Sequence, residues 1–487
     1  MKKLVCAILT MVIMLSFPII IKGAGSHGIQ YGQPMGDDGT IFLTDEVADA
    51  LAATGAGVIR VNFRTGNYGS DTAEWYVKYD EIINRLRDRG FTIIGCLNYE
   101  TLWAPNGQDD WCDNNVEHGG TDGYNAYIDA FGYMAARIAS HFEGRVKYWE
   151  IWNEPNCYSE GDGSTFTGGY FIYPSNFAAL LAHVYTQLRY YNNIDCEVIS
   201  GGLLGHDIAG LNYESSGAQY LSDTYYMGTT YGSWNWILAN AGTYPLDHIG
   251  QHIYISQGGR VSASDISTYC DWVRGAYEAY EGSGTSKKIF MTEFGWETPA
   301  VSEQDQAYNI DVALNTFFSK PYIENATWFY LKDEPGLTFG LYRSSGLSEN
   351  DKKIGWTNFS NKVREEGRYS NRTINYNIAN YFNNNGGMAA FGSPFDNGGS
   401  KWVHYWDYGY VQDFRGGYFG DSIIMTSSSG TFAIILGFRE TYLSGNNHHI
   451  LRFPVSDEYG WGSGTRQDFQ GGYMTWDPYN GVVVHPY

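Results

Sequence analysis

The sequence predicts an α/β fold, a (β/α)8 barrel of the TIM class followed by a smaller C-terminal domain rich in glycine and aromatic residues. From residue 28 to about residue 383, short β-type runs alternate with longer amphipathic stretches, and eight such runs are present. Residues 386–487 lose this alternation and contain an internal repeat. The chain of 487 residues therefore divides into one large domain and one small one.

The predicted elements follow from composition and spacing. The predicted strands are 28–31, 57–63, 92–97, 146–152, 197–201, 248–255, 288–294 and 326–331. The stretches between them have apolar residues at spacings of three and four, which is typical of amphipathic helices. The predicted helices are 45–53, 73–89, 124–142, 175–191, 266–280 and 304–318. A last helix over 373–382 is expected to close the barrel.

The first 25 residues have the layout of a secretory signal. Lys2 and Lys3 precede an apolar stretch over 4–21, and small residues follow. Because Lys22 is unusual before a cleavage region, an uncleaved anchor stays open as an alternative. We expect a signal peptide over 1–25, a barrel over 26–385 and a repeat domain over 386–487. The expected destination is the medium or the cell surface, without membrane contact after cleavage.

The balance of charge excludes some partners. The formal net charge of -22 argues against nucleic acid and against anionic lipid, because neither is attracted at long range. The 41 tyrosines and 15 tryptophans are more suggestive, since flat amphipathic rings stack on sugar faces. Packing in the core and on the surface accounts for most of these rings.

Cysteine usage bears on disulfides and metals. Five cysteines remain once Cys6 is removed with the signal, so at least one thiol lacks an intramolecular partner. Cys112 and Cys157 follow neighbouring predicted strands and are the best disulfide candidates in an oxidising compartment. Cys96 and Cys270 fit core positions. No zinc or EF-hand spacing is present, so we predict no metal and no cofactor.

Two glutamates mark the candidate chemistry. Glu154 and Glu293 each end a short β-type run beside Asn, Pro or Gly, where a strand opens into a loop. Barrel enzymes carry their catalytic groups at these strand ends. Glycoside hydrolysis needs two carboxyl groups, one to protonate the leaving oxygen and one to capture an oxocarbenium-like centre. The alternative is a pair of unrelated surface carboxylates.

The runs around both glutamates resemble those of the retaining glycoside hydrolases of clan A, and their residues are most similar to families 39 and 5. The two runs are Trp149-Glu150-Ile151-Trp152-Asn153-Glu154-Pro155-Asn156 and Met291-Thr292-Glu293-Phe294-Gly295-Trp296. The resemblance implies a (β/α)8 barrel with Glu154 as acid/base and Glu293 as nucleophile. It also implies that Arg60 supports Glu293 and that Asn153 hydrogen-bonds the sugar 2-hydroxyl. An ordinary barrel ion pair is the alternative for Arg60.

His252 and Tyr254 lie two positions apart on the sixth predicted strand, so their rings share one face. Tyr254 is the expected partner of Glu293, and His252 the expected substrate contact, with a satisfied core histidine as the alternative. The predicted substrate-binding residues are Asn98, Trp103, Trp152, Trp296 and Trp328. The register of the eighth strand decides whether Trp328 or Tyr330 faces the site. Lys332 and Asp333 follow as candidate contacts to distal sugars.

The C-terminal repeat consists of two similar runs offset by 55 residues. They are Gln412-Asp413-Phe414-Arg415-Gly416-Gly417-Tyr418 and Gln467-Asp468-Phe469-Gln470-Gly471-Gly472-Tyr473. Together with Leu436-Gly437-Phe438 and Phe453-Pro454, they resemble the LGFP repeat family, although Arg439 breaks the four-letter signature. The resemblance implies attachment to cell wall or polysaccharide. The alternative is a domain that only packs on the barrel.

The favoured hypothesis is therefore a secreted retaining glycoside hydrolase that cleaves β-linked, equatorial bonds of a polysaccharide. Long loops rich in Gly and Tyr are expected after the fourth and fifth strands, over 157–170 and 206–231, and they favour an extended cleft and endo action. Two alternatives stay open: a non-catalytic polysaccharide-binding envelope protein, and a transglycosylase that uses the same carboxylates.

Overall fold

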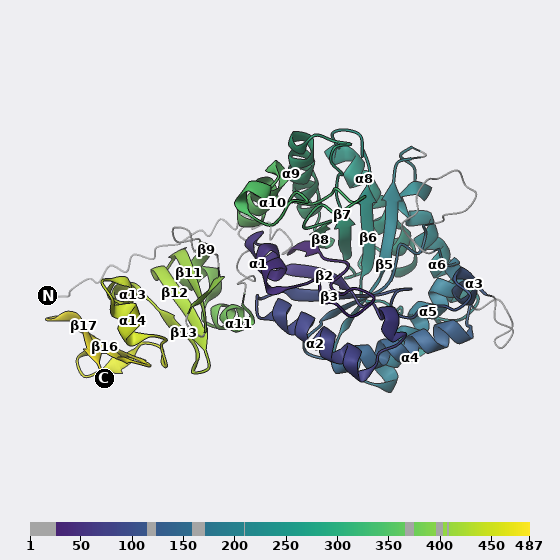
Figure 1. Cartoon of the computed structure of the whole chain (residues 1–487). Coiled ribbons are helices and arrows are strands. Elements are labelled where there is room, and N and C mark those ends of the chain that lie inside the picture. Colours follow the sequence, from purple (N-terminus) through teal and green to yellow (C-terminus); the bar gives the residue numbers. More distant parts are fainter. Residues whose placement is uncertain are drawn as a thin grey trace, which may run out of the picture.

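A computed structural model describes residues 26–113, 123–157, 171–208, 210–365, 375–395, 403–406 and 409–487. Its larger part is a closed barrel of eight parallel strands paired in sequence order, as predicted (Figure 1). The strands are β1 (Ser26–Gln30), β2 (Val58–Asn62), β3 (Thr92–Leu97), β4 (Tyr148–Asn153), β5 (Glu197–His206), β6 (Ile249–Tyr254), β7 (Ile289–Phe294) and β8 (Ile323–Trp328). The predicted signal peptide lies outside the described residues.

Helices surround the barrel strands. They are α1 (Asp45–Ala53), α2 (Ala73–Arg87), α3 (Gln108–Cys112), α4 (Ala126–His141), α5 (Pro174–Thr186), α6 (Ala218–Thr230), α7 (Asn235–Ala241), α8 (Ala263–Glu281), α9 (Glu303–Ser319) and α10 (Ile354–Glu365). Several begin where a Ser, Thr or Asn side chain accepts a first-turn N–H, as Thr44, Asn125 and Ser302 do. In the described part of the chain, no helix is long and apolar enough to cross a membrane.

The barrel interior is polar where strands face one another across it. Arg60 on β2 contacts Glu150 on β4, and the Thr292 hydroxyl on β7 donates to Glu150 Oε1 over 2.6 Å. All three side chains are fully buried. A buried charge is costly unless it is paired and hydrogen-bonded, and this network meets that requirement below the site.

Two predicted segments fold differently. The region after β5, predicted as a long loop, is largely helix α6. The predicted closing helix forms as α11 (Tyr376–Asn384), but it does not close the barrel. Its Phe382 ring stacks on Phe414 of the C-terminal unit at 5.1 Å, and its Tyr381 hydroxyl donates to Asp457 Oδ1 over 2.6 Å. Helix α10 instead packs on α9, where Asn358 donates to Asp311.

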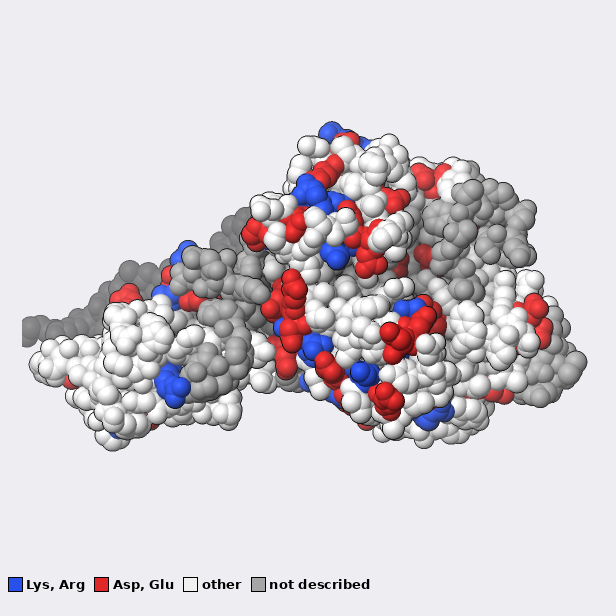
Figure 2. All heavy atoms as spheres, in the orientation of Figure 1, with Lys and Arg blue, Asp and Glu red and all other residues white. Residues whose placement is uncertain are grey.

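The C-terminal unit contains two antiparallel sheets. One consists of β9 (Gly392–Phe395), β10 (Val403–Trp406), β11 (Gly409–Gly417), β12 (Gly420–Ser427) and β13 (Gly430–Ile434). The other consists of β14 (Tyr459–Trp461), β15 (Gly464–Phe469), β16 (Gly472–Asp477) and β17 (Gly481–Pro486). Helices α12 (Gly387–Phe391), α13 (Leu436–Leu443) and α14 (Asn447–Leu451) complete it. Figure 2 shows fewer charged side chains here than on the barrel.

The internal repeat is also a structural repeat up to its phenylalanine. Phe414 on β11 is paired with Pro394, and Phe469 on β15 is paired with Pro454. After the phenylalanine the copies diverge, because Phe414 pairs with Ser422 across its hairpin whereas Phe469 pairs with Gly472. The first hairpin is therefore longer. The LGFP family itself and the predicted boundary at residue 385 stay predictions.

The expected Cys112–Cys157 disulfide is absent, and no cysteine among the described residues forms one. The Cys112 thiol lies 3.4 Å from the carbonyl oxygen of Phe171. Cys157 is buried in a separate small cluster with Leu204 and Tyr254. Neighbouring strands thus brought the two loops to the same end of the barrel, but not the two sulfur atoms together.

Candidate active site

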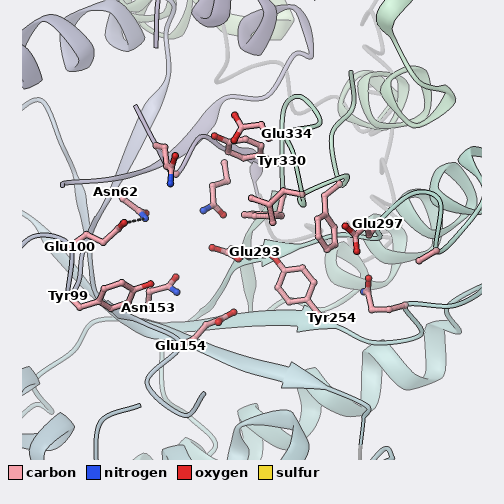
Figure 3. Close-up of a pocket in the computed structure, with 18 residues that line it drawn as sticks. Asn62, Tyr99, Glu100, Asn153, Glu154, Tyr254, Glu293, Glu297, Tyr330 and Glu334 are labelled. Carbon is pink, nitrogen blue, oxygen red and sulfur yellow. Dashed lines mark hydrogen bonds between the residues drawn. The ribbon is translucent and has the colours of Figure 1, made fainter. Parts of the chain in front are cut away.

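A cavity of about 530 Å³ opens at the carboxyl ends of the barrel strands. Figure 3 shows that Glu154 and Glu293 both border it. The lining residues are Gln30, Gly32, Gln33, Asn62, Tyr99, Glu100, Asn153, Glu154, Tyr254, Gln257, Glu293, Glu297, Ala300, Phe329, Tyr330, Glu334, Leu337 and Phe339. The two predicted catalytic glutamates therefore meet in one cavity.

Glu154 and Glu293 reach the cavity by different backbone routes. Glu293 lies within β7, whereas Glu154 directly follows β4 with a left-handed φ of 49°. Trp152, two residues earlier, has φ of 79°. Such angles are strained for residues with a Cβ and need support from the surroundings. Both carboxylates are almost completely buried, so their interactions with neighbouring charges are strong.

Arg60 joins the strand interior to the predicted nucleophile. Its Nη1 lies 2.6 Å from Glu293 Oε1, and its Nη2 donates to Asn153 Oδ1 over 2.8 Å. Its Nε contacts Glu150. The predicted pairing of Arg60 with Glu293 is thus present, and the guanidinium holds Asn153 as well.

Tyr254 contacts the other oxygen of Glu293, as predicted. Its hydroxyl donates to Glu293 Oε2 over 2.7 Å, and burial together with the charge of Glu293 raises the Tyr254 pKa well above its usual value. Gln30 on β1 adds another hydrogen bond to Glu293. Glu293 is therefore surrounded by donors, which favours its ionised form.

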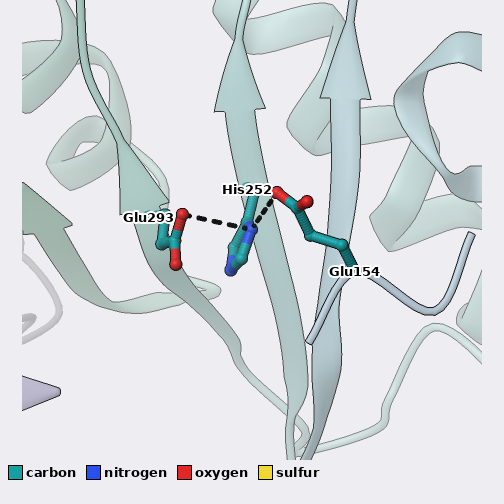
Figure 4. A group of neighbouring side chains, drawn as sticks. All are labelled: Glu154, His252 and Glu293. Carbon is teal, nitrogen blue, oxygen red and sulfur yellow. Dashed lines mark hydrogen bonds and ion pairs between the residues drawn. The ribbon is translucent and has the colours of Figure 1, made fainter. Parts of the chain in front are cut away.

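His252 lies between the two glutamates (Figure 4). Its Nδ1 is 2.9 Å from Glu154 Oε1 and 3.6 Å from Glu293 Oε2. The ring is fully buried and does not line the cavity, so it is a neighbour of both carboxylates rather than the predicted substrate contact. Burial alone would lower the pKa of His252. The charge of Glu293 and the hydrogen bond with Glu154 outweigh burial, so the pKa of His252 lies above its usual value.

The electrostatic surroundings fix the state of Glu293. Burial alone would raise its pKa, but the charges of His252 and Arg60 and the hydrogen bonds from Tyr254 and Gln30 outweigh burial. The pKa of Glu293 is therefore held below its usual value. A carboxylate that stays ionised inside a cavity is suited to act as a nucleophile or as an electrostatic stabiliser.

The prediction that Trp152, Trp296 and Trp328 bind substrate is wrong. All three are fully buried and none lines the cavity. The left-handed φ of Trp152 breaks the strand alternation and turns its ring toward Trp111 at 5.3 Å and Phe131 at 5.9 Å, outside the barrel. Without repacking, these rings cannot stack on a sugar.

The eighth strand resolves the alternative between Trp328 and Tyr330. Asn325 and Thr327 contact each other and lie beside Gly28 of β1, so Trp328 is on the opposite face. Its ring packs against Phe294 at 5.4 Å and against Trp296 at 6.3 Å. Tyr330 borders the cavity instead.

Two other predicted contacts also lie elsewhere. Asn98 is fully buried and its Oδ1 accepts from the Glu100 N–H, so it shapes the loop after β3 without reaching the cavity. Trp103 is 60% exposed and does not line the cavity. Beyond β8, Asp333 is paired with Lys353 at 2.8 Å, which leaves it little freedom to contact a sugar.

The structure adds residues that sequence reasoning missed. Glu150 shares Arg60 with Glu293, and Tyr99, Glu100, Glu297 and Glu334 border the cavity. Tyr99 and Glu100 directly follow Asn98, and Glu297 directly follows Trp296. The sequence indicates only that these residues follow strand ends. Which of several adjacent residues reaches the cavity depends on the conformation of each loop.

Among the described residues, Glu154, His252 and Glu293 form a group whose side chains could hold a metal ion. One ligand atom each from Glu154, His252 and Glu293 lies within 4.8 Å of the others. His252 Nδ1 already contacts Glu154, and Glu293 already accepts from Arg60 and Tyr254, so hydrogen bonds account for these atoms. The expectation of no metal and no cofactor stays a prediction.

Comparisons with known proteins give a likeness in fold. No protein-family model matches the sequence, and no curated protein matches it. A family 1 β-glucosidase from Thermotoga maritima is 14% identical, with a TM-score of 0.50 over 71% of this chain and 98% of that one. A family 39 glycoside hydrolase from Bacteroides cellulosilyticus is 14% identical, with a TM-score of 0.45 over 84% and 72%. A GH5 endoglucanase from Clostridium longisporum is 13% identical, with a TM-score of 0.46 over 71% and 97%.

At this level of identity the likeness shows the fold alone. The chain forms a closed barrel of eight parallel strands, and its likeness to the family 1 β-glucosidase is a likeness in this fold. The chemistry of this chain has to be argued from its own cavity.

Proposed function

We propose that this protein is a retaining glycoside hydrolase that cleaves β-linked, equatorial glycosidic bonds of a polysaccharide by double displacement. The observation that carries the proposal is the pair of carboxylates in one cavity, with oxygens of Glu154 and Glu293 within 4.8 Å. Retaining enzymes hold their two carboxyl groups about 5–5.5 Å apart, whereas inverting enzymes need about 6.5–9.5 Å for a water molecule. The short separation supports retention.

The surroundings divide the two roles. Glu293 is held ionised by Arg60, His252 and Tyr254, so it attacks the anomeric carbon. Glu154 has no contact with Arg60 and protonates the departing oxygen. A glycosyl-enzyme forms on Glu293, and Glu154 then takes a proton from the water that releases the sugar.

Asn153 is positioned to support the attack on the anomeric carbon by binding the sugar. It borders the cavity, and its Oδ1 accepts from Arg60, which leaves its side-chain N–H groups to donate. Hydrogen bonds between the protein and the sugar 2-hydroxyl strengthen as positive charge develops on the ring. The interaction would therefore lower the barrier more than it tightens ground-state binding.

We propose endo action on a polymer. The lining residues extend on both sides of the catalytic pair, with Tyr99 and Glu100 toward β3 and Glu297 and Glu334 beyond β7 and β8. A cavity that continues past both carboxylates can hold sugars on either side of the scissile bond. The segment 206–231 does not support endo action, because its residues 218–230 form α6, and residues 158–170 of the other segment lie outside the described residues.

For the C-terminal unit we propose binding to cell-wall or other insoluble polysaccharide. The outer face of sheet β14–β17 carries Tyr459, Trp461, Tyr473 and Tyr487, and three of these rings are exposed. The Arg466 guanidinium lies over Trp461 at 4.8 Å and over Tyr473 at 3.8 Å. Exposed rings with polar groups between them suit the faces and hydroxyls of sugars.

We also propose export to the medium or the cell surface. The support is the basic, apolar and small-residue order of the first 25 residues. Fractionation of the producing cells with detection of the C-terminal unit tests this, and retention of the full chain in the cytoplasm contradicts it.

The direct test compares the wild type with Glu154→Gln and Glu293→Gln on a panel of β-linked polysaccharides, following reducing ends, chain length and, by NMR, the first anomer released. Rapid chain shortening with a retained first anomer is expected for the wild type alone. An inverted first anomer would refute the double displacement. Equal polymer binding by all three proteins without any cleavage would favour a non-catalytic binding protein, and longer products would favour a transglycosylase.

A further inference from the structure

A second cavity lies on the flank of the barrel. Its lining residues belong to α2, α4 and the turn that follows α5, and these helices run along the same side of the barrel (Figure 1). No described residue lines both this cavity and the one that holds the two glutamates. Its volume of about 630 Å³ falls within the range of small-molecule sites, about 300–1,000 Å³.

Gln187 is a buried residue that borders this second cavity. It is 5% exposed and begins a single π-helical turn, Gln187–Tyr191, at the end of α5. Its backbone N–H donates to the His183 carbonyl, and its own carbonyl accepts from the Asn192 N–H over 3.2 Å and from Asn192 Nδ2 over 2.8 Å. Its backbone groups are therefore satisfied within the turn.

The side-chain amide of Gln187 is different. It makes no hydrogen bond with any residue that the structure describes, yet protein atoms do not cover its nitrogen and oxygen completely. The small exposed part of this residue borders the cavity, so a ligand in the cavity can reach the amide. An almost buried amide without a partner is costly, and a ligand that hydrogen-bonds to it removes that cost.

Three other lining residues offer further hydrogen-bonding atoms. Within the described part of the chain, the Oδ1 of Asn192, the hydroxyl of Ser140 and the Nη1 of Arg137 have no hydrogen-bond partner. Together with the Gln187 amide, they supply donors as well as acceptors. A sugar hydroxyl can both donate and accept, so it matches such a mixed set.

The charges at this cavity are balanced. The Arg137 guanidinium donates to both oxygens of Asp71 over 2.8 and 2.7 Å, and His141 Nε2 lies 2.9 Å from Asp80 Oδ1. An anionic ligand would have to compete with these carboxylates. A cationic ligand finds no carboxylate among the described lining residues. The arrangement therefore favours an uncharged ligand.

Two tyrosine rings add flat surface to the cavity. The Tyr76 ring packs against His141 at 4.3 Å, and the Tyr133 ring meets His183 edge to face at 5.4 Å. Tyr133 is 54% exposed, so part of its ring is open to a ligand while the contact with His183 restricts its movement. Flat rings of this kind bind the apolar faces of sugars and lose little conformational entropy when they do.

We propose that this cavity is a second carbohydrate-binding site, which holds a neutral stretch of polysaccharide on the flank of the barrel. For the nature of its ligand the inference rests on the proposed glycosidase function. A ligand with apolar faces and uncharged hydroxyl groups matches the rings, the free amide and the balanced charges. A chain attached here stays at high local concentration near the catalytic cavity, which favours long chains over short ones.

The test is affinity electrophoresis of the full-length protein with Glu293→Gln, so that the polymers stay intact. Native gels contain soluble β-glucan, xylan, β-mannan or, as an anionic polymer, polygalacturonate. In this parent protein, Tyr133→Ala removes the exposed ring, and Gln187→Met removes the amide at similar length. We expect each change to weaken the affinity for at least one neutral polymer about fivefold. Tyr226→Ala removes an exposed ring from α6 outside both cavities and should bind like the parent.

Three results would overturn the proposal: a parent that binds no neutral polymer, Tyr133→Ala binding every neutral polymer like the parent, or losses confined to polygalacturonate. Denaturant titration shows whether Gln187→Met is folded, and Tyr133→Ala, at an exposed position, carries the test if it is not. In the protein with Glu293 intact, Tyr133→Ala should slow cleavage of the long polymer and leave cleavage of a tetrasaccharide unchanged. A wild type that cleaves neither would refute the glycosidase function and leave the binding test in place.

Discussion

Nδ1 of His252 lies 2.9 Å from Oε1 of Glu154, so the buried imidazole directly contacts the proposed acid/base. The same nitrogen is 3.6 Å from Glu293. One ring thus connects the two carboxylates, and its protonation changes the field at both. The raised pKa of His252 favours the charged form, which in turn favours ionised Glu293.

Replacing this imidazole should move the pH dependence of the reaction. In His252→Asn the positive charge that most lowers the Glu293 pKa is lost, so that pKa rises. The proposed nucleophile must be ionised, and its protonation would set the acidic limb of the kcat/KM profile. We expect this limb to move to higher pH. An acidic limb that stays in place in the variant would contradict a role for His252 in holding Glu293 ionised.

The Tyr254 hydroxyl should have a similar effect of smaller extent. Tyr254→Phe removes the 2.7 Å hydrogen bond to Glu293 Oε2 but keeps the ring. Hydrogen bonds to charged groups contribute about 1.5–3 kcal/mol, which corresponds to a loss of roughly 10- to 100-fold in kcat/KM. The Glu293 pKa should rise, and the acidic limb should move in the same direction as in His252→Asn. Tyr308→Phe, at an exposed ring on α9, is the control and should leave the profile unchanged.

The fold and the place of the two glutamates at strand ends were predictable because they rest on local sequence. Strand-like runs and amphipathic stretches specify eight repeats, and the two glutamates stand at strand ends beside residues that open a loop. The contact of Arg60 with Glu293 was implied by the resemblance to clan A. The contact of Tyr254 with Glu293 was expected because side chains on a regular strand alternate between its two faces.

The rest of the site depends on departures from regular strands. The left-handed φ of Trp152 places its ring outside the barrel, and no residue type at that position indicates such an angle. Loop conformation decides that Tyr99 reaches the cavity and Asn98 does not. Likewise, the order of predicted helices cannot tell that α11 packs on the C-terminal unit, because this depends on the long-range contact of Phe382 with Phe414.

The buried pair of Arg60 and Glu150 should contribute to stability. Glu150→Gln keeps the shape of the side chain but removes one of the two charges that balance the guanidinium. Breaking a buried ion pair typically costs about 3–5 kcal/mol of unfolding free energy. Because Arg60 keeps its contact with Glu293 in this variant, we expect a loss at the lower end, about 3 kcal/mol. The free energy of unfolding from denaturant titration measures it. The control is Glu349→Gln, whose partner is Lys352 and whose side chain is 86% exposed, with an expected change below about 0.5 kcal/mol. Equal losses in both variants would contradict the prediction.

Polysaccharide binding by the C-terminal unit should depend on its aromatic face. Trp461→Ala removes an exposed ring and the surface on which Arg466 lies. We expect co-sedimentation with insoluble cell-wall polysaccharide to weaken about tenfold, as for an aromatic residue central to an interface. Trp236→Ala removes an equally exposed tryptophan from α7 and should bind like the wild type. Wild-type binding by the Trp461 variant would assign the C-terminal unit to packing alone.

Substitutions of Tyr99 and Trp152 should have different effects, because Tyr99 is placed to contact a sugar and Trp152 packs in the core. Their rings meet edge to face at 6.0 Å, but only Tyr99 borders the cavity, while Trp152 is fully buried behind it. Tyr99→Ala should therefore lower kcat/KM about tenfold through lost contact with the sugar, with a change in unfolding free energy of about 1 kcal/mol. Trp152→Ala should lower the unfolding free energy by about 3–5 kcal/mol, because it leaves a cavity among Trp111 and Phe131. Kinetics and denaturant titration on both variants decide the matter. If Trp152→Ala lost activity with unchanged stability, the tryptophan would contact substrate and its assignment to core packing would be contradicted.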